Sequence, residues 1–271
     1  MRSESINVLV FGAHPDDCDI KAGGTAVKYA TAGHNVRFVS VTNGDAGHHE
    51  IGGIELATRR RDEATAAGEA LGIEYHVMDH HDGELEPTLE RRKKFIREIR
   101  RFEPDLVFTH RPNDYHPDHR YTSQLVQDSA FMVTVPNICT DTPALRENPV
   151  MAYLSDDFQK PYPFSPNVIV AIDDVIDRKL EALHQHTSQF YEWLPWNLGI
   201  HEDVPSDEAA RKEWLKEHWL DRSEKLADRF RDQLIERYGD AGEDVTYAEA
   251  YEECEYGSDL TAEKQAALFP K

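Results

Sequence analysis

The chain contains 271 residues, of which 30 are Lys or Arg and 51 are Asp or Glu, so its formal net charge is −21. This acidity disfavours nucleic acids and anionic membrane surfaces as partners, because both require a basic face on the protein. No apolar run approaches the roughly 20 residues of a membrane span, and the start of the chain lacks a signal peptide's apolar stretch, so we expect a cytoplasmic protein.

Along the chain, short β-branched or apolar runs alternate with amphipathic patterns of helical period. We expect strands at residues 6–12, 35–41, 74–78, 105–109 and 167–172. The helical patterns fall between and after these strands, at residues 21–32, 55–71, 89–102, 118–131 and 174–189. Such alternation is typical of a mostly parallel sheet covered by helices.

The rest of the chain has a different pattern. The segment 133–166 is rich in proline and is predicted to be a long loop. Beyond residue 196 the sequence predicts polar helices near 206–238 and 246–256. We therefore predict an α/β fold, with a Rossmann-like, mostly parallel sheet flanked by helices in a domain of residues 1–195. Residues 196–271 are predicted to form an acidic helical extension packed on that core.

Two segments place histidine and aspartate at the ends of predicted strands. Residues 12–19 follow the first strand, and residues 110–119 follow the fourth. Because parallel strands present their carboxyl ends at one edge of the sheet, these two loops can converge on one crevice. His and Asp are good zinc ligands, and a catalytic zinc site uses three protein ligands. The cysteines Cys18, Cys139 and Cys254 are odd in number and far apart, so they fit neither disulfides nor a Cys-rich zinc site.

These segments supply every group that a metal-dependent hydrolase needs. A divalent metal lowers the pKa of its bound water and polarises the carbonyl under attack, while a carboxylate takes the water's proton. Asp16 and Asp17 are adjacent, so one can bind the metal while the other faces the water. His116 and His119 share one face of a helix whose first position suits Pro117.

Two other classes of protein remain as alternatives. Two histidines and one carboxylate also suit ferrous iron in oxygenases. A non-catalytic carbohydrate-binding protein is the second alternative, although binding alone has no need of a base such as Asp16. Nucleotide binding has no support, because the chain contains neither G-x-G-x-x-G nor G-x-x-x-x-G-K-[ST].

Residues 13–19, followed by Gly23-Gly24-Thr25, resemble the amino-terminal motif of the LmbE-like (PIG-L) deacetylases. Residues 116–120 resemble the second motif of the same family, and the resemblance extends over roughly residues 6–190. These enzymes remove acetyl groups from N-acetylglucosamine units. The resemblance therefore implies a zinc-dependent N-deacetylase, with Fe²⁺ as the alternative metal, that acts on a small N-acetylated sugar or glycoside. Relatives are often trimers or hexamers, so a homo-oligomer is also implied.

Carried over residue by residue, the resemblance implies that His14, Asp17 and His119 bind zinc. Asp16 would be the general base that acts on the metal-bound water. His116 would stabilise the oxyanion or protonate the leaving amine.

The resemblance implies two further roles and shows two departures. Asp118 would orient His116 and favour its charged form, and Arg60 falls where the family often has an arginine that grips the substrate. Independently of the resemblance, Asn43 is expected to bind substrate, because its loop follows the second strand and should border the same crevice. The departures are Asp19, where the family more often has glutamate, and the position two residues before His116. Some members have an oxyanion-binding tyrosine at that position, which here is Asp114, with Tyr115 one residue later.

Overall fold

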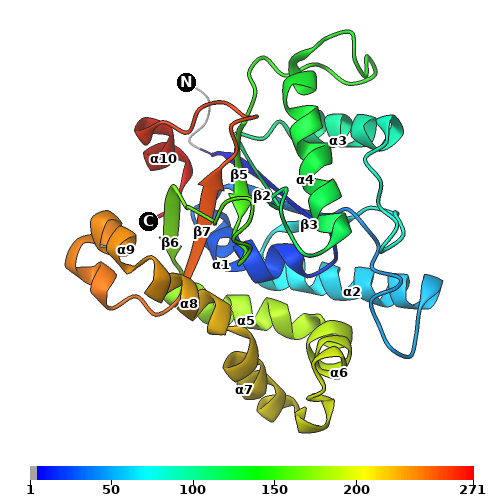
Figure 1. Ribbon diagram of the computed structural model, residues 1–271, viewed down its shortest axis with the longest axis vertical. Coiled ribbons are helices and arrows are strands. Elements are labelled where there is room, and N and C mark those ends of the chain that lie inside the picture. The colour runs from blue at the N-terminus through cyan, green and yellow to red at the C-terminus, as the bar shows by residue number, and fades with distance from the viewer. Residues whose placement is uncertain (1–4) are drawn as a thin grey trace.

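The computed structural model describes residues 5–271 and places a seven-stranded sheet at its centre (Figure 1). The strands are β1 (Asn7–Gly12), β2 (Asn35–Ser40), β3 (Glu74–Val77), β4 (Leu106–Thr109), β5 (Val150–Leu154), β6 (Val168–Ala171) and β7 (Ala248–Glu253). Their order across the sheet is β3-β2-β1-β4-β5-β7-β6. Strands β1 to β5 pair in parallel, whereas β7 runs antiparallel to both of its neighbours. The predicted mostly parallel sheet is therefore confirmed.

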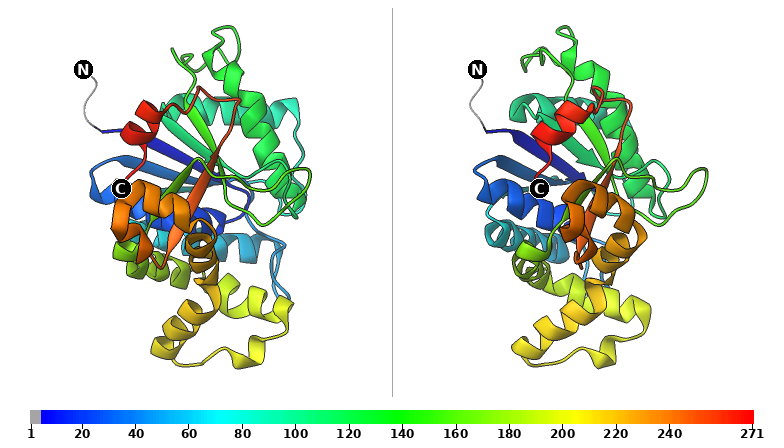
Figure 2. Two further views of the ribbon diagram at one scale, coloured as in Figure 1. Left: turned by 60° about the vertical axis from the view of Figure 1, so that its left-hand side comes forward. Right: turned by 90° about the vertical axis from the view of Figure 1, so that its left-hand side faces the viewer.

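Helices cover both faces of the sheet (Figure 2). They are α1 (Asp17–Thr31), α2 (Gly53–Leu71), α3 (Leu89–Phe102), α4 (Pro117–Ala130), α5 (Ile176–Gln185), α6 (Leu194–Leu198), α7 (Glu208–Trp219), α8 (Asp221–Arg229), α9 (Arg231–Tyr238) and α10 (Ala262–Leu268). Side chains of β1 alternate between two cores, as the two-residue period of a strand requires. Val8 and Val10 pack with α1, α2 and α5, whereas Leu9 and Phe11 pack with α3 and α4. Within residues 5–271, no helix is long and apolar enough to cross a bilayer.

The chain beyond residue 196 forms helices in the predicted 206–238 region, but it also contributes a strand to the sheet. The helix predicted near 246–256 is wrong, because this segment contains β7, which lies between β5 and β6. Ala248 and Ala250 pack beside α8 in one core, and Tyr251 enters the core formed with α1. The acidic residues of this segment resemble a solvated helix in sequence. The long loop predicted at 133–166 likewise contains one strand, β5.

A buried ion pair joins β7 to α5, and both of its side chains bond to α1. The carboxylate of Glu249 accepts hydrogen bonds from the backbone N–H groups of Gly24 at 2.9 Å and Thr25 at 2.8 Å. Lys179 donates to Glu249 at 2.7 Å and to the carbonyl oxygen of Ile20 at 2.8 Å. These two side chains therefore bond backbone groups in the middle of α1, the helix that begins at the candidate site.

We expect Glu249→Gln to lower the free energy of unfolding by about 3–5 kcal/mol, because it leaves the buried Lys179 without its countercharge. Urea denaturation followed by circular dichroism measures this difference. Glu236→Gln, which neutralises an exposed acid on α9, is the matched control. Equal unfolding free energies for the two variants would contradict this account of the ion pair.

The same pair predicts a pH dependence of stability. Burial alone would raise the pKa of Glu249, but Lys179 and the hydrogen bonds from Thr25 outweigh burial and lower it. A carboxyl group with a depressed folded pKa adds stability above its unfolded pKa of about 4.3, and this stability is lost as the pH falls through the folded value. The stability difference between the parent and Glu249→Gln should therefore shrink as the pH falls below that unfolded value. A difference that grows with acidity would contradict the sign.

Candidate active site

The loops after β1 and β4 lie side by side, because β1 and β4 are neighbouring parallel strands. After β1 the chain turns sharply, with the Asp16 N–H donating to the carbonyl oxygen of His14 at 2.9 Å, and α1 begins at Asp17. Asp16 has a φ of 155°, which residues other than glycine rarely adopt. Strain of this kind persists only where the surroundings impose it, and it concentrates at functional sites.

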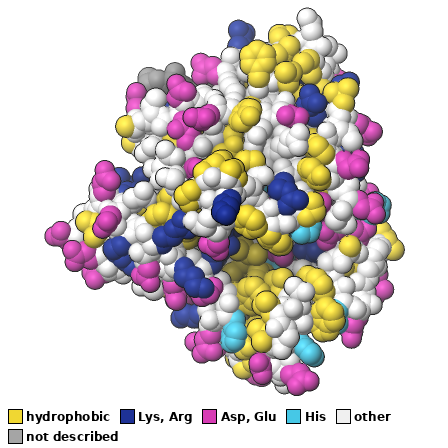
Figure 3. Space-filling view, viewed as in Figure 1, with side chains coloured by type: hydrophobic (Ala, Val, Ile, Leu, Met, Phe, Trp, Pro, Cys, Tyr) yellow, Lys and Arg dark blue, Asp and Glu magenta, His cyan; other side chains and the backbone are white. Residues whose placement is uncertain are grey.

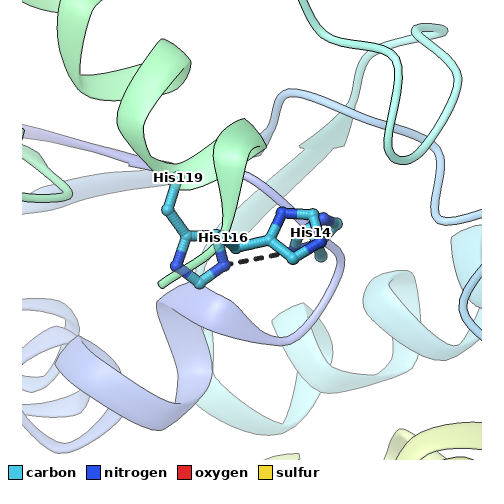
Figure 4. Close-up of side chains that lie close together, drawn as sticks. All are labelled: His14, His116 and His119. Carbon is cyan, nitrogen blue, oxygen red and sulfur yellow. Dashed lines mark hydrogen bonds between the residues drawn. The ribbon is translucent and has the colours of Figure 1, made fainter. Parts of the chain in front are cut away.

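The second motif forms the beginning of α4. Pro117 is the first helical residue, and His116 caps the helix through its ring, whose Nδ1 accepts a hydrogen bond from the backbone N–H of Asp118 at 3.2 Å. The predicted helix start is therefore confirmed. Because His116 and His119 are three residues apart on the helix, both face the loop after β1, where Figure 4 shows them beside His14.

The three predicted metal ligands converge. Nδ1 of His14 lies 3.3 Å from Nε2 of His119 (Figure 4). The carboxylate of Asp17 approaches both rings, with Oδ2 at 3.4 Å from His14 Nδ1 and Oδ1 at 3.4 Å from His119 Nε2. Ligands at roughly 2.0–2.1 Å in a tetrahedron around zinc lie about 3.3–3.4 Å apart. The two imidazole nitrogens therefore have the spacing of zinc ligands, and Asp17 approaches each ring with a different carboxylate oxygen.

The charge around these donors also fits a cation. Five carboxylates with little exposure surround the site, those of Asp16, Asp17, Asp82, Asp114 and Asp118. They contact two cationic side chains, Arg60 and Lys21. Burial opposes protonation of His14, but Asp118, Asp17 and Asp82 raise its pKa well above the usual value. A surplus of buried negative charge is costly unless a cation offsets it.

Other donor groups at this site could also hold a metal ion. Each brings three ligand atoms within 4.8 Å of one another, and their members are His14, His116 and His119; Asp17, His110 and His119; or His14, Asp82 and Asp118. All of these groups share a residue with the predicted set. The alternative sets therefore differ in which side of the His14 and His119 rings a cation would occupy.

The ring of His119 is fixed in position by Asp114 and His110, whose roles the sequence analysis did not identify. Its Nδ1 lies 3.0 Å from Asp114 Oδ1, a pairing that places the proton on Nδ1 and leaves Nε2 free to bind a metal. The ring of His110 stacks on His119 with centroids 4.0 Å apart. Lys21 lies 3.6 Å from Asp114 and 3.2 Å from His110. Asp114 and His110 belong to the segment that the sequence singled out, but nothing in their spacing indicates which ring they support.

The structure corrects the expected partner of Asp118. Its carboxylate accepts hydrogen bonds from the backbone N–H groups of Gly83 at 2.7 Å and Leu85 at 3.3 Å, and it lies 3.4 Å from His14 Nε2. Asp118 therefore faces His14 and the loop after β3, whereas His116 contacts only its backbone N–H. The helix start explains this, because the side chain of the second helical residue points away from the cap.

Asp82 is a further site residue that the sequence analysis missed. Its Oδ1 lies 3.1 Å from His14 Nε2, and its Oδ2 lies 3.7 Å from Arg60. Burial would raise the pKa of Asp82, but His14 and then Arg60 outweigh it and lower the pKa to about 2. The signal was available in principle, because Asp82 follows the predicted third strand and strand ends share this edge of the sheet.

Asp16 and Arg60 form a contact at the floor of the site. Arg60 is 2% exposed, donates to the carbonyl oxygens of Gly44 and Pro15, and lies 3.5 Å from the carboxylate of Asp16. Burial raises the pKa of Asp16 to about 6, with Arg60 opposing and Asp17 adding to the rise. A Cβ at Gly44, whose φ is 70°, would lie within 2.4 Å of the Arg60 guanidinium. Arg60 thus links the loop after β1 to the loop after β2 beside Asp16. The predicted contact between Arg60 and substrate stays a prediction.

His116 presents one nitrogen to the cavity. Because Nδ1 accepts a hydrogen bond from the backbone, the neutral ring carries its proton on Nε2, for which no hydrogen bond is found within residues 5–271. Burial lowers the pKa of His116, and the neighbouring His14 and His119 lower it further, against smaller opposing effects of Asp118 and Asp82. The expected charging of His116 by Asp118 is therefore replaced by a neutral ring that can donate a hydrogen bond.

Asn43 does not occupy the expected place. Its side-chain amide donates to Asp79 at 3.0 Å, and its side-chain oxygen accepts from the backbone of Asp45 at 3.1 Å. It is 4% exposed and is not among the residues that line the cavity. Both ends of the amide hold the loop in shape, and the predicted contact between Asn43 and substrate stays a prediction.

These residues open into one large cavity of about 710 Å³. The loops after β1 and β4 form one wall, with His14, Asp16, Asp17 and His116 among the lining residues. The opposite wall comes from the π-helical turn Ser188–Trp193, α6 and α8. Figure 3 shows a hollow near the middle of this face, with hydrophobic side chains inside it and Lys and Arg side chains beside it. The volume lies in the upper part of the ~300–1,000 Å³ range of small-molecule sites.

Known proteins are similar to this chain over most of its length. Residues 9–130 match the family described as GlcNAc-PI de-N-acetylase (PIG-L). A diacetylchitobiose deacetylase of Thermococcus kodakarensis is 34% identical over 197 residues, covering 70% of this chain and 73% of the relative. A 4-oxalmesaconate hydratase of Pseudomonas putida is 24% identical, covering 71% and 78%. The solved structure of N,N'-diacetylchitobiose deacetylase from Pyrococcus horikoshii matches with a TM-score of 0.72 at 27% identity, covering 96% of this chain and 88% of that one.

We expect zinc to bind to the purified protein, and His119→Ala to weaken its binding more than about 100-fold, because a ligand is lost. Asp114→Asn should weaken zinc binding about 10–100-fold, because it only orients His119. Competition titration with a chromophoric chelator measures both affinities, and His201→Ala, at an exposed position, is the control. Parent-like zinc affinity in His119→Ala would contradict the assignment.

Proposed function

Because the chain belongs to the GlcNAc-PI de-N-acetylase (PIG-L) family, we propose that it hydrolyses the N-acetyl group of an amino sugar of the N-acetylglucosamine type. One observation carries the proposal: His14 and Asp17 line a cavity together with Asp16 and His116, and His119 Nε2 lies 3.3 Å from His14 Nδ1. A carbohydrate-binding protein without activity does not need a carboxylate such as that of Asp16, whose backbone is strained, beside the proposed metal ligands. Two similar proteins that act on diacetylchitobiose, both named for deacetylation, support the substrate class.

The metal would be held by His14, Asp17 and His119. We propose zinc rather than ferrous iron, because amide hydrolysis needs a Lewis acid to polarise the carbonyl and involves no change of redox state. Asp114 fixes the ring of His119 from one side, and the carboxylates of Asp82 and Asp118 face the outer nitrogen of His14.

Asp16 is the general base in this proposal. Its pKa of about 6 lies well above that of an ordinary aspartate, because the carboxylate is buried, and Arg60 keeps it oriented. A base with a pKa near the working pH both stays ionised and accepts a proton readily. Once Asp16 has taken the proton of the attacking water, it holds the proton that the departing amine requires.

His116 acts as a hydrogen-bond donor to the oxygen of the acetyl group. Negative charge develops on that oxygen as the tetrahedral intermediate forms. His116 lines the cavity and its neutral ring keeps a proton on Nε2, so a donor is available before the reaction begins. A preorganised donor of this kind stabilises the transition state more than the ground state.

The decisive assay follows acetate and free amine when the zinc-loaded protein is incubated with N,N'-diacetylchitobiose. We expect one acetate for each new amine. The relative from Pseudomonas putida is a hydratase, so 4-oxalmesaconate is offered in parallel. Hydration of that acid without release of acetate from any N-acetylated sugar would overturn the proposed function, and so would tight sugar binding without turnover.

We expect Asp16→Asn to retain zinc but to lower kcat by about 10²–10⁴, because an amide cannot accept the water's proton. Steady-state kinetics on diacetylchitobiose measure the loss, with metal content determined on the same samples. Asp62→Asn, on an exposed position of α2, is the matched control. Near-parent turnover in Asp16→Asn would mean that a different group is the base.

We expect His116→Ala to lower kcat by about 10²-fold or more while KM changes little, because the lost hydrogen bond forms mainly in the transition state. His116→Gln, which restores an N–H donor, should recover part of kcat. Loss of zinc in both variants would identify His116 as a ligand and contradict the donor role, and so would parent-like kcat in His116→Ala.

A further inference from the structure

The cavity extends well beyond the catalytic loops, and one face of α8 lines its far side. The lining residues from this helix include Arg222, Lys225, Leu226 and Arg229. Their spacing of three, four and seven residues from Arg222 corresponds to a single helical face. The same helix packs Leu226 and Ala227 against the core beside β6 and β7, so α8 is fixed in place by buried apolar contacts.

The cations on this face are incompletely paired, which is unusual in a chain with a net charge of −21. Within residues 5–271, neither Arg222 nor Arg229 has a carboxylate within 4.0 Å of its guanidinium. Arg222 donates to the carbonyl oxygen of Ser155, and its Nε is buried without a partner. Arg229 makes one long hydrogen bond of 3.4 Å, to the carbonyl oxygen of Phe164, and its guanidinium lies 4.9 Å from the centroid of the Phe230 ring. Their charges therefore remain available to a ligand.

Two acidic side chains also line this end of the cavity and must be counted. Asp221 lies 2.6 Å from the ammonium group of Lys225, so these two charges offset each other. Asp157 is exposed and has no salt bridge within the described part of the chain. Three cations thus face two carboxylates, and the two arginines carry the positive surplus.

Part of the cavity wall is apolar and aromatic. Trp193, Leu194 and Trp219 line this part. Trp196 stacks on both Trp193 and His49, with ring centroids 5.6 Å and 4.9 Å away. The stacked rings of His49 and Trp196 hold Trp193 in place in the cavity wall. The cavity therefore offers an aromatic passage of the kind that accommodates the apolar face of a sugar ring or a short apolar linker.

We infer that α8 forms a second subsite, which binds an anionic group, a phosphate or a carboxylate, on the part of the substrate attached to the N-acetylated sugar. The inference rests on the proposed function, because the sugar's acetamide must first lie at the His14, Asp17 and His119 end. Arg222 and Arg229 contact the anion, and guanidinium groups bind carboxylate and phosphate oxygens in bidentate fashion. Substrates without such a group fill the cavity only partly.

The test compares three N-acetylglucosamine glycosides on the zinc-loaded protein. Their aglycones share one short alkyl linker and end in a phosphate, a carboxylate or a neutral carboxamide. We expect kcat/KM to favour the two anionic glycosides over the carboxamide by about tenfold or more, mainly through KM, and the preference to shrink as salt is added. The phosphate and carboxylate arms identify which anion fits better.

Variants locate the effect on α8. Arg222→Gln combined with Arg229→Gln should reduce the anionic preference at least tenfold, whereas Arg222→Lys should retain part of it. Arg61→Gln, which removes an exposed cation from α2, is the matched control and should leave the preference unchanged. Calorimetry on Asp16→Asn protein carrying the same α8 substitutions provides a binding readout that is independent of turnover.

The outcomes separate the two proposals. If all three glycosides release acetate with equal efficiency, or if the double variant keeps the parent's preference, the α8 subsite is wrong and the deacetylase remains. If no glycoside or chitobiose releases acetate, the proposed function fails and the subsite inference fails with it.

Discussion

The site depends on the approach of two imidazole rings from separate loops. His14 Nδ1 and His119 Nε2 lie 3.3 Å apart, and the carboxylate of Asp17 lies 3.4 Å from each. Two nitrogen lone pairs facing each other at this distance repel unless a proton or a cation lies between them. The arrangement exists because β1 and β4 are neighbouring parallel strands, so that the loop after one meets the helix after the other. Every catalytic role proposed for the chain follows from that adjacency.

The buried carboxylates of Asp114, Asp82 and Asp118 give the site a negative charge that a cation would offset. They also orient the two imidazole rings. Asp114 determines the tautomer of His119, while Asp82 and Asp118 face the outer nitrogen of His14. Asp118 also accepts hydrogen bonds from the loop after β3, so charge at the centre holds that loop against the site. Glu249 acts at a greater distance, because its hydrogen bonds to α1 hold the helix that begins with Asp17.

Strand ends were the part of the site that sequence could predict. His14 and His119 follow strands with clear patterns, and strand ends determine where loops converge. The partner of Asp118 could not be predicted, because it depends on how the first turn of α4 points each side chain. Strand β7 was missed because its acidic composition matches a solvated helix, and the burial of Glu249 depends on Lys179 from a distant helix. The face of α8 was hidden for a similar reason, because unpaired arginines on a polar helix look like ordinary surface charge.

The location of the metal tests this account most directly. Crystals of the zinc-loaded protein, measured on both sides of the zinc absorption edge, would place the ion by its anomalous scattering. The account predicts one strong peak within bonding distance of His14 Nδ1, His119 Nε2 and the Asp17 carboxylate. A peak on the other side of the His14 ring, between Nε2 and the carboxylates of Asp82 and Asp118, would contradict it. His119 and Asp17 would then not be the metal ligands, and Asp16 would not lie beside the metal-binding residues.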